Sequence, residues 1–207
     1  MATHWTCILV DLDGTIADSA PGITASLSYM FEEMGHPVPS AEELRAYVGP
    51  PIVDSFRDRA GFTPVEAAQA LSIYRRHYME GNNAHGSDIF PGMPEVLKTL
   101  HASGIPLSLA TSKPEFPASV ILDHANLTQY FRVMAGASID EIRSAKKDVV
   151  VSNPVMIGDR NYDIEGAAEH GIPTIYVDWG YGNPGESEGS LAVVSKAEEL
   201  LPLLLPN

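Results

Sequence analysis

The sequence is short of cysteine, of basic residues and of long apolar runs, and each shortage narrows the class of protein. Cys7 is the only cysteine among 207 residues, so the chain has no disulfide framework. The 13 basic residues face 27 acids, for a formal net charge of −14, which disfavours nucleic acid or an anionic membrane as partner. No segment reaches the length of a membrane span, and residues 1–5 lack the pattern of a secretion signal. We therefore expect a cytoplasmic protein.

The chain contains enough apolar residues to form a substantial hydrophobic core. Hydrophobic residues make up 44% of the sequence, which suits one large domain or a core domain with a smaller insert. Because the chain is acidic, an anionic substrate would need local help from a metal ion, a lysine or backbone amides.

The pattern of residues 19–82 predicts helices and no strands. Apolar residues at positions 23, 27, 31 and 34 recur at helical spacing, and Gly35 then stops the helix. A capping box at 40–43 opens a second helix, which Gly49-Pro50-Pro51 ends. We expect a third helix over 53–60 and a fourth from 63 to about 79.

From about residue 90 the pattern alternates between strands and helices. Strands are predicted at 7–10, 105–110, 131–135, 155–157, 172–177 and 191–194, with helices at 94–100, 114–125, 162–170 and from 195. Such alternation favours an α/β fold with a Rossmann-like parallel sheet covered on both faces. The helical block is then an insert, most simply a cap over the carboxyl edge of the sheet.

The most informative stretch is Asp11-Leu12-Asp13-Gly14-Thr15, which follows the apolar run 7–10. A buried strand that ends this way holds both acids at the carboxyl edge of the sheet, where α/β proteins bind ligands. Alternation along the strand aims Asp11 and Asp13 to the same side, so their charges repel unless a cation or a proton lies between them.

Polar residues follow three further strands. Thr111-Ser112-Lys113 ends the second strand, Lys146 follows the third, and Gly158-Asp159 follows the fourth, with Asp163 one helical turn beyond Asp159. Each feature alone has an ordinary explanation as a turn, a helix cap or a solvated charge. Four of them at the same edge of consecutive strands favour a functional site.

In order along the chain, these residues resemble the four motifs of the haloacid dehalogenase superfamily. The motifs are Asp11-Leu12-Asp13-Gly14-Thr15, the strand that ends in Thr111, Lys146, and Gly158-Asp159 with Asp163. The resemblance covers nearly the whole chain and includes a helical insert of the C1 cap type. Thr111-Ser112-Lys113-Pro114 and Tyr47-Val48-Gly49-Pro50-Pro51 suggest the phosphoglycolate phosphatase-like branch, including relatives that hydrolyse nucleoside monophosphates.

The resemblance implies roles for the site residues. Asp11 would attack phosphorus to give an aspartyl-phosphate, and Asp13 would protonate the leaving group and then activate water. The phosphoryl group would be bound by Asp13, Gly14, Thr111, Ser112 and Lys146, of which Thr111 and Lys146 are also assigned to catalysis. A Mg²⁺ cofactor would be held by Asp11, Asp13 through its carbonyl, and Asp159, with Asp163 in support.

The sequence departs from the family pattern at two places. Only eleven residues separate Lys146 from Gly158, so either this connection is short or a segment is missing near Val151. This leaves Lys147 as an alternative to Lys146. The loop at Gly49-Pro50-Pro51 is apolar, where sugar phosphomutases of the superfamily carry an arginine, which disfavours a mutase.

The resulting prediction is a core domain at 1–16 and 88–207 with a helical cap domain at 17–87, hinged near 16–19 and 87–91. It would be a Mg²⁺-dependent phosphatase, monomeric or homodimeric, acting on a small phosphorylated metabolite. A sugar phosphomutase and a non-catalytic phosphate-binding module remain as alternatives. Arg45, Tyr47 and Arg57 are candidates for contact with the leaving group, although Arg57 also suits an exposed surface position.

Overall fold

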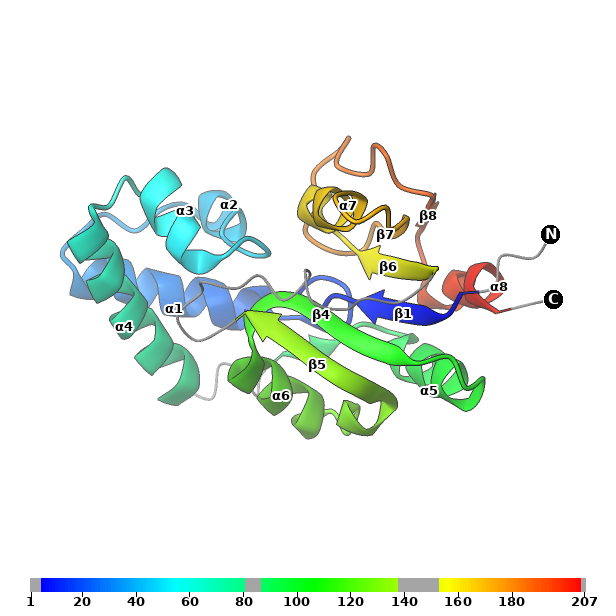
Figure 1. Ribbon diagram of the computed structural model, residues 1–207. Helices are drawn as coiled ribbons and strands as arrows, with labels where there is room; N and C mark the ends of the chain where they lie inside the picture. The colour runs from blue at the N-terminus through cyan, green and yellow to red at the C-terminus, as the bar shows by residue number, and fades with distance from the viewer. Residues whose placement is uncertain (1–4, 81–86, 138–152, 206–207) are drawn as a thin grey trace.

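The fold is built on a six-stranded parallel sheet, as the computed structural model shows for residues 5–80, 87–137 and 153–205 (Figure 1). The strand order is β5-β4-β1-β6-β7-β8, and neighbouring strands in this order pair in parallel. The strands are β1 (Cys7–Val10), β4 (Leu107–Pro114), β5 (Phe131–Ala137), β6 (Pro154–Gly158), β7 (Thr174–Val177) and β8 (Ala192–Val194). The predicted α/β class is confirmed.

Helices cover both faces of this sheet because its strands are apolar on both sides. Ile8 and Val10 pack in the larger core with α5 (Met93–Ala102), α6 (Glu115–His124), the 3₁₀ helix η3 (Ala197–Leu200) and α8 (Leu201–Leu204). Cys7 and Leu9, which alternate with them, pack on the opposite face against α7 (Asn161–Ala168). A short 3₁₀ helix, η1 (Thr128–Tyr130), leads into β5. None of the described helices is long and apolar enough to cross a membrane.

A second group of helices lies to one side of the sheet and has its own core (Figure 1). It consists of residues 20–80, which we call the helical lobe, and contains α1 (Ala20–Glu33), α2 (Ala41–Arg45), α3 (Ile52–Asp58) and α4 (Pro64–Glu80) with the loops between them. We call the rest of the described chain the sheet lobe. The aromatic rings of Phe31, Phe56, Phe62 and Tyr74 pack together at the centre of the helical lobe.

The structure corrects the predicted elements at several boundaries. Two short strands, β2 (Ala17–Asp18) and β3 (Asp88–Ile89), pair antiparallel at the two crossings between the lobes, although no strand was predicted there. They are too short to show a hydrophobic period. Helix α2 ends at Arg45 rather than at the Gly-Pro-Pro loop, and β4 continues through Pro114 into residues that were predicted to begin a helix.

The sheet topology explains where a site forms. From β1 the chain order runs outward through β4 and β5 on one side and through β6, β7 and β8 on the other. The carboxyl end of β1 is therefore a topological switch point, where the flanking connections diverge and leave a crevice. Asp11 and Asp13 follow β1 directly at this point.

Candidate functional site

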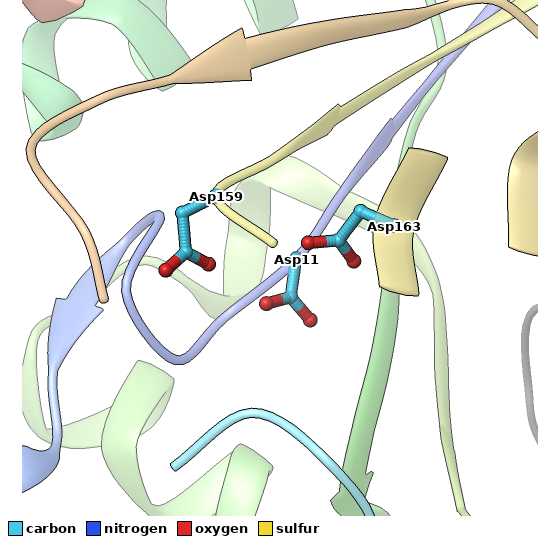
Figure 2. A group of neighbouring side chains, drawn as sticks. All are labelled: Asp11, Asp159 and Asp163. Carbon is cyan, nitrogen blue, oxygen red and sulfur yellow. The ribbon is translucent and has the colours of Figure 1, made fainter. Parts of the chain in front are cut away.

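Three buried carboxylates meet at the carboxyl ends of β1 and β6 (Figure 2). Asp11 follows β1, Asp159 follows β6, and Asp163 lies in the first turn of α7. One carboxylate oxygen from each lies within 4.8 Å of those of the other two. The sequence motifs that end β1 and β6 are therefore brought together as predicted.

Two glycines allow the backbone to close around Asp159. A Cβ atom built on Gly14 would lie 2.2 Å from Asp159 Oδ2, and one on Gly180 would lie 2.3 Å from the same atom. Gly14 also has a φ of +89°, which side chains other than glycine rarely adopt. Between these contacts the backbone N–H of Tyr181 donates to Asp159 Oδ2 at 2.7 Å, and the Thr15 hydroxyl donates to Oδ1 at 3.4 Å. The orientation of Asp159 is thus fixed from several sides.

Asp163 is oriented by the start of its own helix. The backbone N–H of Arg160 donates to Asp163 Oδ2 at 3.1 Å, as in a helix capping interaction. Gly158 leaves room for this arrangement, since a Cβ there would lie 2.3 Å from Asp163 Oδ2. The Asp163 carboxylate therefore lies against the end of β6, which Asp159 follows.

The donor set fits a hard divalent cation. Burial, together with the charge of Asp163, raises the pKa of Asp159 to about 7, because an ionised carboxylate is costly in this enclosed cluster. A bound cation would offset that cost, and carboxylate oxygens are the ligands that Mg²⁺ prefers. Asp11, Asp159 and Asp163 could hold such an ion.

Asp13 is paired with a lysine. Lys113 Nζ donates to Asp13 Oδ1 at 3.0 Å and to Oδ2 at 2.9 Å, and both side chains are buried. Burial alone would lower the pKa of Lys113, but the Asp13 carboxylate raises it above its usual range, so the side chain is an ammonium. The ammonium also lies 5.0 Å from the centre of the Tyr78 ring in the helical lobe.

The remaining predicted residues follow β4 or fall outside the described chain. Thr111 is buried, and its hydroxyl accepts from the backbone N–H of Lys113 at 3.2 Å. Ser112 lines the cavity described below, beside Asp13 and Lys113. Lys146 and Lys147 lie outside the described residues, so their placement stays a prediction.

A cavity of about 210 Å³ separates the two lobes and opens onto Asp13 and Lys113. Its walls are largely apolar. The helical lobe contributes Ile23, Tyr47, Gly49, Pro50, Ile52, Tyr74, Arg75, Tyr78 and Met79, and the sheet lobe contributes Ser112, Pro114, Phe116 and Pro117. Of the three residues predicted to contact a leaving group, Tyr47 lines this cavity. Arg45 lines a different hollow, and Arg57 is exposed and paired with Asp54.

Arg160 connects the strand end next to the carboxylate cluster with the helical lobe. Its Nη1 donates to the carbonyl oxygen of Val48 at 2.6 Å, and its Nε pairs with Glu186 at 2.8 Å. Gly49 lets the guanidinium approach, since a Cβ there would lie 3.2 Å from Nη1. The residue next to Asp159 thus holds the loop that lines the cavity.

Lys113, Arg160 and Tyr181 were missed as site residues in the sequence prediction. A signal existed for Lys113, because it lies two residues beyond Thr111 on β4 and alternation places both on one side. No local pattern marks Arg160, whose partner Val48 is 112 positions away. The sequence analysis placed no site residue in the loop of Tyr181, yet the backbone N–H of Tyr181 donates to Asp159.

Comparison with known proteins finds similarity to hydrolases and phosphatases. The haloacid dehalogenase-like hydrolase family matches residues 8–177. A solved structure described as a predicted phosphatase from Clostridium acetobutylicum has a TM-score of 0.89 and 32% identity, covering 95% of this chain and 96% of that one. A plasmid phosphoglycolate phosphatase from Cupriavidus necator is 33% identical, over 97% of this chain and 94% of its own.

Another similar protein is the tyrosine-protein kinase PtkA of Mycobacterium tuberculosis, which is 40% identical over 84% of this chain. The aligned region covers 62% of the length of PtkA. The family match spans both the carboxylate cluster and the helical lobe, so the resemblance inferred from the four motifs is confirmed. The chain belongs to the haloacid dehalogenase-like hydrolase family.

Proposed function

We propose that the protein is a Mg²⁺-dependent phosphatase that hydrolyses a small phosphomonoester through an aspartyl-phosphate on Asp11. The observation that carries this proposal is the convergence of Asp11, Asp159 and Asp163 beside the Asp13–Lys113 pair. Two acids with different partners at one sheet edge suit a reaction that needs one nucleophile and one proton carrier. The family membership supports hydrolysis as the reaction type.

In the first step, a carboxylate oxygen of Asp11 attacks phosphorus and the bond from phosphorus to the leaving-group oxygen breaks. Asp13, which must exchange its ion pair with the Lys113 ammonium for a proton before this step, gives that proton to the departing oxygen. In the second step, Asp13 takes a proton from water, which attacks the phosphorus of the aspartyl-phosphate. Inorganic phosphate then leaves, and the Asp11 carboxylate is restored.

The other residues bind and orient the phosphoryl group. Mg²⁺ held by Asp11 and Asp159, with Asp163 in support and the Asp13 carbonyl as a further ligand, would neutralise phosphoryl charge as it builds up. The Thr111 hydroxyl and the backbone amides of Asp13, Gly14 and Ser112 would bind the phosphoryl oxygens, as amides at strand ends do. Lys146 would offset their charge.

We further propose that the helical lobe is a cap domain, residues 17–87, on a core formed by 1–16 and 88–207. Its own hydrophobic core and the β2–β3 ribbon at the two crossings support this division. Closing such a lobe over the sheet edge excludes water from Asp11, which protects the intermediate until Asp13 activates a water molecule.

The test is phosphate release with Mg²⁺ and with EDTA, using phosphoglycolate, nucleoside 5′-monophosphates and hexose phosphates. We expect turnover that EDTA abolishes and that falls by about 10⁴-fold or more in Asp11→Asn. Asp58→Asn, an exposed aspartate in the helical lobe, is the matched control and should keep full activity. Turnover that survives in Asp11→Asn would refute the mechanism. Little phosphate release, with phosphoryl transfer to a sugar that requires a bisphosphate activator, would indicate a phosphomutase instead.

A further inference from the structure

The cavity between the lobes has a composition that selects a substrate class. It opens onto Asp13, the residue that would protonate the leaving group, so whatever is attached to the phosphoryl group must lie in it. Three tyrosines line it from the helical lobe, namely Tyr47, Tyr74 and Tyr78. All three are buried and belong to the core of that lobe, so the walls are held by packing.

Two of the tyrosines form one aromatic wall close to the acid. The ring centre of Tyr78 is 5.0 Å from the ammonium of Lys113, which pairs with Asp13. Tyr74 stacks on Tyr78 with ring centres 5.7 Å apart and an angle of 15° between the planes. A cation held over one ring and a second ring stacked beside it make a rigid aromatic wall.

The opposite wall comes from the sheet lobe and contains an exposed aromatic side chain. Phe116 lies in the first turn of α6, lines the cavity and is 62% exposed. Pro114 and Pro117 flank it in the same lining. A large apolar side chain left in water at the mouth of an apolar cavity is typical of a binding surface for an apolar ligand group.

The cationic groups of the cavity lining are few. Among the described lining residues, Lys113 and Arg75 carry positive charge, and Lys113 is bound to both oxygens of Asp13. A small anionic leaving group such as glycolate would need to compete with Asp13 for Lys113 or use Arg75, and it would leave the aromatic walls largely uncovered.

We propose that the preferred substrates are phosphomonoesters whose leaving group carries an aromatic ring, with the ring seated between Tyr74 and Tyr78 on one side and Phe116 on the other. This inference rests on the proposed phosphatase function of the same site. A phosphorylated aryl group and a nucleoside 5′-monophosphate share this chemistry, and the experiment separates them.

The experiment compares two substrates with leaving alkoxides of similar basicity, 2-phenylethyl phosphate and ethyl phosphate. Phosphoglycolate, phosphotyrosine and a nucleoside 5′-monophosphate are added to the panel. We expect kcat/KM to be about tenfold or more higher for 2-phenylethyl phosphate than for ethyl phosphate or phosphoglycolate, as burial of an aromatic ring predicts. The lower KM of the last two panel members identifies the kind of aromatic group, because their leaving oxygens differ in basicity and their rates are not comparable.

Variants of the exposed phenylalanine test the contact itself. Phe116→Ala should lower the ratio of kcat/KM for 2-phenylethyl over ethyl phosphate about fivefold, and Phe116→Trp should keep it. Leu191→Ala is the matched control, because Leu191 is 58% exposed and lies outside the cavity lining. Phe116 is exposed, so its removal leaves the fold intact.

The outcomes separate this inference from the proposed function. If no panel member releases phosphate in a Mg²⁺-dependent way, the proposed function fails. If phosphate is released but ethyl phosphate or phosphoglycolate matches the aromatic substrate, the substrate class is wrong and the phosphatase stands. An unchanged ratio in Phe116→Ala would likewise overturn the placement of the ring.

Discussion

The two lobes bury different kinds of side chains. Within the described residues, all six buried charged side chains belong to the sheet lobe, namely Asp11, Asp13, Lys113, Asp159, Arg160 and Asp163. The buried residues of the helical lobe include six aromatic rings, those of Phe31, Tyr47, Phe56, Phe62, Tyr74 and Tyr78. Burying charge costs free energy unless partners or an ion compensate, whereas burying rings stabilises. The sheet lobe therefore carries the charged groups that a reaction needs, and the helical lobe supplies a packed aromatic surface.

After the loss of the Asp11 nucleophile, the largest expected effect comes from removing the charge of Asp159 from the sheet lobe. Asp159→Asn should lower kcat by roughly 10³-fold, as expected for loss of a charged group that organises the transition state. Steady-state phosphate release at saturating Mg²⁺ measures it. Asp178→Asn, an exposed aspartate of the same lobe, is the control. A kcat within threefold of the wild type would mean that Asp159 does not serve the reaction.

The Asp13–Lys113 pair tests how far the sheet lobe depends on charge compensation. Lys113→Met should destabilise the fold by about 3–5 kcal/mol, because it leaves the buried Asp13 without its partner. Adding Asp13→Asn should recover most of that loss. Urea unfolding of both variants measures the change, with the exposed Lys98→Met as control. Equal destabilisation by the single and double variants would show that packing, rather than charge, is lost.

Arg160 makes a hydrogen bond between the lobes that a single substitution can remove. Arg160→Gln should raise KM about tenfold and change kcat less, because the loop at Val48 loses its guanidinium partner while Asp159 stays in place. Arg160→Lys should recover part of the affinity. Arg57→Gln removes an exposed guanidinium of the helical lobe and serves as control. A fall in kcat with unchanged KM would place Arg160 in the chemical step instead.

A smaller effect is expected in the pH dependence of stability without metal. The folded-state pKa of Asp159 is raised to about 7, so the folded protein holds this proton more tightly than the unfolded chain. The stabilisation is full below about pH 4, near the ordinary pKa of an aspartate, and is lost as the pH rises from there to about 7. In EDTA the melting temperature should therefore fall over this range, and it should fall less in Asp159→Asn. Mg²⁺ at about 100 times its dissociation constant should restore about 2.7 kcal/mol at pH 8. No Mg²⁺ response in the wild type would argue against the metal site.

The contrast between the lobes also explains what the sequence could predict. Asp11 and Asp159 follow apolar strands that a hydrophobic pattern reveals, so their meeting at one sheet edge follows from the α/β fold. Contacts between the lobes depend on distant pairs, such as Arg160 with Val48, which lie 112 positions apart. Side-chain direction in three dimensions decides such pairs, and local spacing carries little information about it. Of the cavity lining, Asp13, Ser112 and Tyr47 were predicted as site residues, and the other side chains of the walls were missed for the same reason.

The central claim is that Asp11 in the sheet lobe becomes phosphorylated during turnover. The direct measurement is an acid quench of the enzyme during steady-state hydrolysis of 2-phenylethyl phosphate or the fastest panel substrate, followed by peptide mass spectrometry. We predict a phosphoryl group on the peptide that contains Asp11, present with Mg²⁺ and absent in Asp11→Asn. Mg²⁺-dependent turnover with the phosphoryl group on a different residue would contradict the account.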